Sequence, residues 1–176
     1  MSYFIIVRGP LGCGKTTIAK RLAQDLRAEH ISIDDILDEH GLDQADPEIG
    51  GISAANFIKA NEIVLPGVKD ALKNGKVVVF DGCFYHKEAI DHLIDNLPYP
   101  HYVFTLKAPV EMCITRDKGR SKTYGEDAAR VVHMFVSKFD YGINIDASGT
   151  FENTVEAIRS HLPNPTQPPL TLRGGD

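Results

Sequence analysis

Four residues near the N-terminus have the types and spacing of a loop that binds phosphate groups. Gly9, Gly14, Lys15 and Thr16 fit the pattern G-x-x-x-x-G-K-[ST]. Glycines permit a tight turn whose backbone N–H groups point into one concavity, and a following helix directs its positive end to the same point. The lysine supplies a cation for the β- and γ-phosphates, and the threonine hydroxyl is a ligand for Mg²⁺. The residues expected to hold a nucleoside triphosphate are Gly12, Cys13, Gly14, Lys15, Thr16 and Thr17.

Two adjacent carboxylates, Asp34 and Asp35, follow a short apolar run at residues 30–33. Carboxylates just beyond the carboxyl end of a parallel strand lie on the rim where open α/β sheets bind their ligands. We therefore expect at least one of the two to act on a substrate. The alternative is that one of them caps a helix, because Ile36 and Leu37 follow, and one pair can serve both roles.

A third carboxylate, Asp81, ends a β-branched run at residues 76–80. In phosphate-loop enzymes an acid at the end of such a strand holds Mg²⁺ or its water shell. The sequence therefore predicts that Thr16 and Asp81 are the metal residues. The alternative is that Asp81 and Gly82 only form a turn.

A basic segment lies in the second half of an otherwise acidic chain. Four of the seven residues at 116–122 are basic, and a glycine interrupts the run. The segment predicts a small lid at about residues 116–126, in which Arg116 and Arg120 stabilise charge on a transferring phosphoryl group. The alternative is a solvated surface. A second segment, residues 40–52, is longer than an ordinary connection and is either a substrate cover or a surface excursion.

The elements that must position these residues alternate between strand and helix, which predicts an α/β fold with a parallel sheet and helices on both faces. Strands are expected at 3–8, 30–33, 76–82, 101–106 and 141–146. Helices are expected at 15–28, 53–73, 124–138 and 151–162. Two further helices are expected to begin at about residue 83 and at residue 109. Within the second helix, Pro66 is expected to produce a kink or a restart, and Asn61 to face solvent.

Composition limits the remaining choices. A chain of 176 residues indicates one domain, here residues 1–162, followed by a Pro/Gly-rich tail at 163–176 that we expect to be disordered. The net charge of −5 disfavours an extended nucleic-acid surface, and the apolar runs are too short to cross a membrane. Three widely spaced cysteines indicate a reducing, cytoplasmic compartment. The sequence leaves open whether the chain is a monomer or a homodimer.

Taken together, these residues resemble the small P-loop kinases. The resemblance spans residues 3–162 and is strongest to polynucleotide-kinase-like, zeta-toxin-like and chloramphenicol-phosphotransferase-like proteins, beside adenylate and shikimate kinases. It implies the three-layer P-loop NTPase fold, with five strands in the order 2-3-1-4-5. It further implies that Asp34 accepts the proton of the substrate hydroxyl, that Arg116 and Arg120 are lid arginines, and that residues 145–149 border the adenine.

The chain departs from those families at two places. Leu37 stands where polynucleotide kinases have an arginine, and Cys83-Phe84-Tyr85 replaces the Phe-Pro-Arg of adenylate kinases. Both missing arginines bind substrate phosphate in those families, so a non-phosphorylated alcohol is favoured as the acceptor. The expected activity is transfer of the γ-phosphate of ATP, with Mg²⁺, to a hydroxyl of a small molecule. A nucleoside or nucleotide kinase and a partner-dependent ATPase switch are the alternatives. The expected catalytic residues are Lys15, Asp34, Arg116 and Arg120.

Overall fold

One parallel sheet of five strands organises the molecule, which a computed structural model describes for residues 1–121 and 123–164. The strands are β1 (Phe4–Arg8), β2 (Glu29–Ser32), β3 (Val78–Gly82), β4 (His101–Lys107) and β5 (Ile143–Asp146). Their order is β2-β3-β1-β4-β5, and every neighbouring pair is parallel. The predicted fold class and strand order are confirmed.

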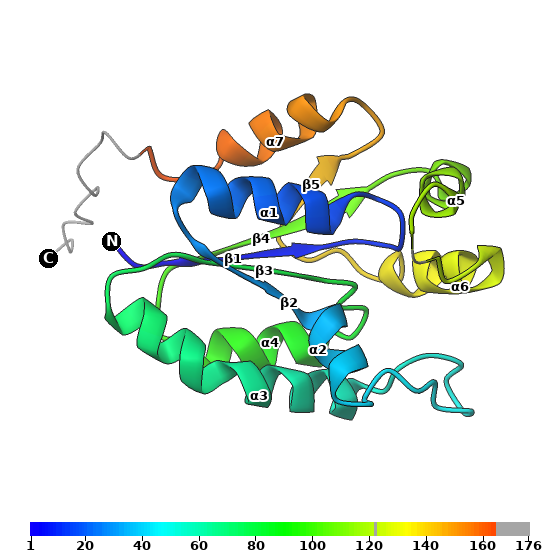
Figure 1. Ribbon diagram of the computed structural model, residues 1–176, viewed down its shortest axis with the longest axis horizontal. Coiled ribbons are helices and arrows are strands. Elements are labelled where there is room, and N and C mark those ends of the chain that lie inside the picture. Colours follow the sequence, from blue (N-terminus) through cyan, green and yellow to red (C-terminus); the bar gives the residue numbers. More distant parts are fainter. Residues whose placement is uncertain (122, 165–176) are drawn as a thin grey trace, which may run out of the picture.

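Helices cover both faces of this sheet (Figure 1). They are α1 (Lys15–Leu26), α2 (Ile33–Glu39), α3 (Ala54–Lys73), α4 (Lys87–Asn96), α5 (Val110–Lys118), α6 (Glu126–Val136) and α7 (Phe151–Arg159). In Figure 1, α1 and α7 lie above the sheet and α3 and α4 below it, while α5 and α6 lie beyond the carboxyl ends of the strands. Among the described residues, no helix combines the length and the apolar character needed to span a membrane.

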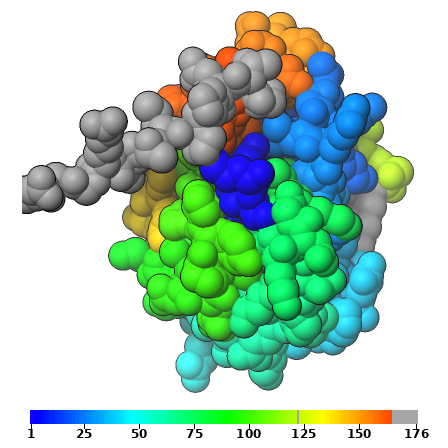
Figure 2. All heavy atoms as spheres, turned by 90° about the vertical axis from the view of Figure 1, so that its left-hand side faces the viewer, coloured from blue at the N-terminus to red at the C-terminus, as the bar shows by residue number. Residues whose placement is uncertain are grey.

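The central strand β1 explains why the phosphate loop lies in the middle of the molecule. Phe4 and Ile6 pack into the core beneath α3 and α4, whereas Ile5 and Val7 pack into the core beneath α1 and α7. Both faces of β1 are therefore buried, which accounts for its continuous apolar run. At the opposite end of the sheet, α1, α3 and α4 surround the first residues of the chain (Figure 2). The phosphate loop follows the last residue of β1, at the carboxyl edge of the sheet.

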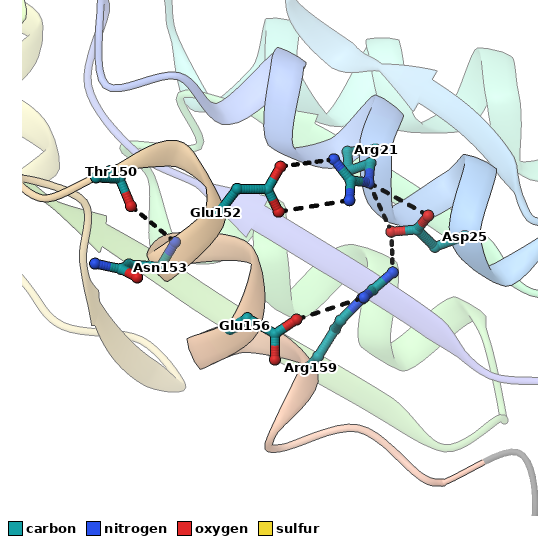
Figure 3. Close-up of polar contacts among 7 residues, drawn as sticks. All are labelled: Arg21, Asp25, Thr150, Glu152, Asn153, Glu156 and Arg159. Carbon is teal, nitrogen blue, oxygen red and sulfur yellow. Dashed lines mark hydrogen bonds and ion pairs between the residues drawn. The ribbon is translucent and has the colours of Figure 1, made fainter.

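Surface ion pairs fasten α7 to α1 (Figure 3). Arg21 on α1 contacts Asp25 and Glu152, with Nη1 of Arg21 at 3.0 Å from Oε1 of Glu152. Arg159 near the end of α7 returns to the same Asp25. A single ion pair at the surface contributes little to the stability of the fold. Several pairs that share Asp25 and Arg21 form a network, which fixes the relative position of the two helices.

The local structure differs from the sequence prediction at the end of β2. Ile33 begins α2 instead of ending a strand, and the helix cap is Ser32, whose Oγ accepts a hydrogen bond from the Asp35 amide at 3.3 Å. Asp34 and Asp35 therefore occupy the first turn of α2, where carboxylates interact favourably with the helix dipole. The prediction that one of them caps the helix is wrong.

The long helix α3 does not restart at Pro66, and Asn61 within it is buried instead of facing solvent. The helix continues through Pro66, which lies on an exposed face where water can satisfy the carbonyl that the proline leaves free. Asn61 is fully buried and its Nδ2 donates to the Ala89 carbonyl oxygen at 2.8 Å, so it links α3 to α4 instead of facing solvent. Lys122 of the predicted lid and residues 165–176 of the predicted disordered tail lie outside the described residues.

Candidate active site

The phosphate loop connects the end of β1 to the start of α1 and depends on two left-handed glycines. Gly12 has φ 77° and Gly14 has φ 91°, a region that side chains rarely adopt. A Cβ atom on Gly12 would lie 2.1 Å from the Cys113 carbonyl oxygen, so the loop packs directly on the backbone of α5. Gly12 is thus required by both conformation and space, whereas Gly14 is required by conformation.

Lys15 is the first residue of α1 and is 5% exposed. Its Nζ donates to the Pro10 carbonyl oxygen at 3.4 Å and lies 3.6 Å from Oδ2 of Asp34. Burial on its own would lower the pKa of the ammonium group, but Cys83 and Asp34 lead the surrounding groups that together raise it. The side chain therefore stays charged and ready to bind an anion.

A cavity of about 200 Å³ adjoins the loop, and we call it the phosphate cavity. Its lining residues are Gly12, Gly14, Lys15, Thr16, Thr17, Arg116 and Arg120. The structure therefore brings both predicted arginines to the loop, although Arg116 comes from the last turn of α5 and Arg120 from the segment after it. The Cys13 side chain is buried and lies away from this lining.

The two arginines are held differently. Arg116 donates from Nη1 to the Ala147 carbonyl oxygen at 2.9 Å, which ties it to the turn after β5. Arg120 is 46% exposed and its Nη1 lies 4.0 Å from Oδ1 of the buried Asp117. Three cations thus face one small cavity in an acidic chain, an arrangement that favours a polyanionic ligand.

The predicted metal residues, Thr16 and Asp81, are in direct contact. Oγ1 of Thr16 donates to Oδ1 of Asp81 at 2.8 Å, and Asp81 is fully buried at the end of β3. Nε2 of His30 lies 2.5 Å from the other carboxylate oxygen of Asp81. A hydroxyl and a carboxylate are the hard oxygen donors that Mg²⁺ prefers, so the pair fits this ion.

Asp34 lies between the phosphate loop and the start of the segment after β3. Its Oδ1 accepts a hydrogen bond from the Cys83 amide at 3.1 Å, and its Oδ2 faces the Cys83 thiol at 3.4 Å as well as Lys15. The neighbouring Asp35 is exposed and does not line either cavity. Of the two predicted carboxylates, the structure places only Asp34 beside the loop.

A second cavity, of about 380 Å³, opens on the other side of Asp34, and we call it the acceptor cavity. Residues 43, 45 and 50–52 form one wall of it, so the 40–52 segment faces the site instead of leaving it. The Ile52 amide donates to the Tyr85 hydroxyl at 2.7 Å, which fastens this segment to the body of the protein. A Cβ on Gly51 would lie 2.8 Å from Cε2 of Phe135, so the segment also packs closely against α6.

Sequence analysis missed His30 and Arg8. Arg8 is fully buried at the end of β1, and its guanidinium donates to the carbonyl oxygens of Phe84 and Val136 at 3.3 and 3.0 Å. Burial lowers the pKa of this group to about 10. The available signal was a basic residue inside an apolar strand immediately before Gly9. His30 gave no local signal, because its partner is 51 residues away.

Comparison with known proteins identifies the family of the chain. Residues 4–138 match the AAA domain family (AAA_33). The chain is 33% identical over 129 residues to an adenylate kinase of Deinococcus radiodurans, which covers 66% of this chain and 64% of the relative. It is 31% identical over 152 residues to an adenylate kinase of Mycoplasmopsis pulmonis, covering 81% of this chain and 70% of that protein. The chain therefore spans less than two thirds of the Deinococcus protein.

Solved structures share the fold at low sequence identity. An unliganded sugar kinase from Janibacter sp. HTCC2649 has a TM-score of 0.73 at 16% identity, covering 91% of this chain and 94% of that one. A shikimate kinase from Aquifex aeolicus has a TM-score of 0.55 at 19% identity, with coverage of 89% and 94%. The family match covers well over half of the chain and includes the whole phosphate loop. The chain therefore belongs to the AAA domain family and is homologous to adenylate kinases.

Proposed function

We propose that this protein is an ATP- and Mg²⁺-dependent phosphotransferase that moves the γ-phosphate to a hydroxyl group of a small molecule. One observation carries the proposal: Lys15 lines the phosphate cavity, Asp34 lines the acceptor cavity, and the two side chains are 3.6 Å apart. A phosphate donor on one side and an alcohol on the other would meet at this pair. Such positioning accounts for much of the catalytic effect in phosphoryl transfer.

In this reaction the oxygen of the acceptor forms a bond to the γ-phosphorus as the bond to the β-phosphate oxygen breaks and ADP leaves. Asp34 takes the hydroxyl proton. Lys15, Arg116 and Arg120 stabilise the charge on the transferring group. Thr16 and Asp81 would hold Mg²⁺, which supplies further charge neutralisation on the phosphates when bound.

A nucleotide kinase is the second candidate, and the curated relatives favour it because they are named adenylate kinases. In that case the acceptor would be a nucleoside monophosphate, whose phosphate needs basic side chains beside Asp34. Transfer of phosphate to AMP at a rate above that for uncharged alcohols would support this candidate.

Comparison of Lys15→Ala with Lys20→Ala tests the proposed function. Lys20 is an exposed lysine on the same helix, so its removal controls for loss of a charge. We expect Lys15→Ala to lower ATP-dependent phosphorylation of an alcohol by about 100-fold or more, with Lys20→Ala close to wild type. Product formation is followed by ³¹P NMR in the absence of any protein partner. Equal turnover in the two variants would remove the proposal, and turnover without a partner excludes an ATPase switch.

A further inference from the structure

The acceptor cavity is negatively charged. Three carboxylates line it, Asp34 from α2, Asp43 from the 40–52 segment and Asp127 from the first turn of α6. Among the described residues, no lysine, arginine or histidine contributes to the lining. Within the same described part of the chain, neither Asp43 nor Asp127 forms an ion pair with a cation. An anionic ligand placed there would be repelled by these carboxylates, and the described lining offers it no basic side chain.

Three cations that contact residues in or beside this lining have other partners. Arg8 donates to the carbonyl oxygens of buried backbone and does not line the cavity. Lys15 faces the phosphate cavity, where it would bind ATP. Lys138 lies with Nζ 4.7 Å from the centre of the Phe135 ring, outside the lining residues. Positive charge in this region therefore serves the fold or the phosphate donor.

The remaining lining is apolar and aromatic. The rings of Phe57 and Tyr85 meet edge to face with centroids 5.1 Å apart, and Tyr85 stacks on Phe135 at the same distance. Leu11 and Leu37 extend this surface toward Asp34. A cavity of 380 Å³ has the size of ordinary small-molecule sites, and an apolar lining favours a ligand body of similar character.

We propose that the acceptor is an alcohol with an apolar body and no negative charge, either neutral or carrying an amine, and that phosphorylated or carboxylated alcohols are excluded. This inference rests on the proposed function and specifies its substrate class. The apolar body would contact Phe57 and Tyr85, with its hydroxyl beside Asp34. Asp43 and Asp127 reject negative charge and favour an amine.

Three matched probes test the substrate class. They are 2-phenyl-1-propanol, which is neutral, phenylglycinol, which carries an amine, and tropic acid, which carries a carboxylate. Each has a primary alcohol on the same phenyl scaffold. With Mg²⁺ and a non-hydrolysable ATP analogue bound, we expect the first two to raise the melting temperature and tropic acid to leave it unchanged. With ATP, phosphorylation of phenylglycinol should exceed that of tropic acid by at least tenfold in kcat/KM.

Charge-reversal variants assign this preference to the cavity. Asp43→Lys and Asp127→Lys should each reduce the preference for the amine over the carboxylate by about tenfold, which corresponds to about 1.4 kcal/mol. Asp70→Lys is the matched control, because Asp70 is an exposed carboxylate near the end of α3 and away from the cavity. It should keep the wild-type preference.

The outcomes separate this inference from the proposed function. If ATP binds in a Lys15-dependent manner but tropic acid or AMP is bound and phosphorylated as well as phenylglycinol, the substrate class is wrong and the kinase assignment stands. The same conclusion follows if ATP binds and none of the three probes shifts the melting temperature at millimolar concentration. If ATP itself does not bind, both proposals fail together.

Discussion

Thr16 on α1 donates its hydroxyl hydrogen to the buried carboxylate of Asp81 on β3 over 2.8 Å. The two residues are 65 positions apart in the chain, and the sheet brings them together because β3 lies beside β1. His30 contacts the second oxygen of the same carboxylate from β2. The side chain of Asp81 is thus held in one orientation by groups from two different elements, as a metal-binding carboxylate requires.

Loss of the Thr16 hydroxyl should weaken the response to Mg²⁺. Thr16→Val keeps the shape of the side chain but removes the oxygen that would bind the ion. We expect the Mg²⁺ concentration for half-maximal phosphoryl transfer to rise by about tenfold to 100-fold, as found for lost metal contacts. Thr16→Ser retains the hydroxyl and should respond to Mg²⁺ like the wild type. Identical Mg²⁺ titrations for the two variants would show that Thr16 does not bind the metal.

Asp34 and Asp35 form a natural matched pair for testing the proton acceptor. Asp34→Asn removes the base but keeps an oxygen for the Cys83 amide, so the fold should survive. We expect phosphoryl transfer to fall by about 100-fold or more while ATP affinity changes little. Asp35→Asn should retain activity, because that side chain is exposed and lines neither cavity. A fully active Asp34→Asn protein would exclude this residue as the base.

Sequence could predict the phosphate loop because its function depends on local chemistry. Gly14, Lys15 and Thr16 are neighbours in the chain, and their spacing fixes both the turn and the start of the helix. The acceptor cavity depends instead on packing between distant parts. Asp43 and Asp127 are separated by almost half of the chain and line one cavity only because the 40–52 segment packs against α6. Periodicity and propensity contain no information on such an encounter.

The same limit explains the errors made within single elements. Asn61 has the polarity of a solvated residue, and only the neighbouring α4 supplies the carbonyl group that makes burial acceptable. The end of β2 was misplaced because Ile33 is β-branched and apolar, whereas the cap formed by Ser32 starts the helix there. In both cases a hydrogen bond to another group outweighs the preference that the residue type has on its own.

Gly12 should be far less tolerant of alanine than another left-handed glycine. Both Gly12 and Gly41 have positive φ, 77° and 65°, so alanine at either position costs about 1–2 kcal/mol of stability. At Gly41 nothing lies within 4 Å of an added Cβ, whereas at Gly12 the Cys113 carbonyl oxygen would be 2.1 Å away. We expect Gly12→Ala to cost at least about 2 kcal/mol more than Gly41→Ala in urea unfolding, and to abolish ATP binding. Equal costs would show that the loop can move away from α5.

Alkaline pH should destabilise the fold through its buried thiols. Burial raises the pKa of Cys113 from an ordinary value of 9.0 to about 11, and it also raises the pKa of Cys13 and Cys83. The unfolded chain releases the Cys113 proton near pH 9 while the folded chain retains it to about pH 11. Across this range the folded state binds more protons, so its stability falls as pH rises. For one thiol the slope is about 1.4 kcal/mol per pH unit.

Urea unfolding between pH 8 and pH 11 measures this slope directly. Cys113→Ala should lose stability at every pH because it removes buried volume, yet its stability should fall less steeply than that of the wild type. Ile114→Val is the matched control, since Ile114 is a buried neighbour that does not titrate. This variant should lose about 0.5–1.5 kcal/mol of unfolding free energy, and its plot of stability against pH should run parallel to that of the wild type. A Cys113→Ala curve parallel to both would mean that this thiol titrates alike in the folded and unfolded chain.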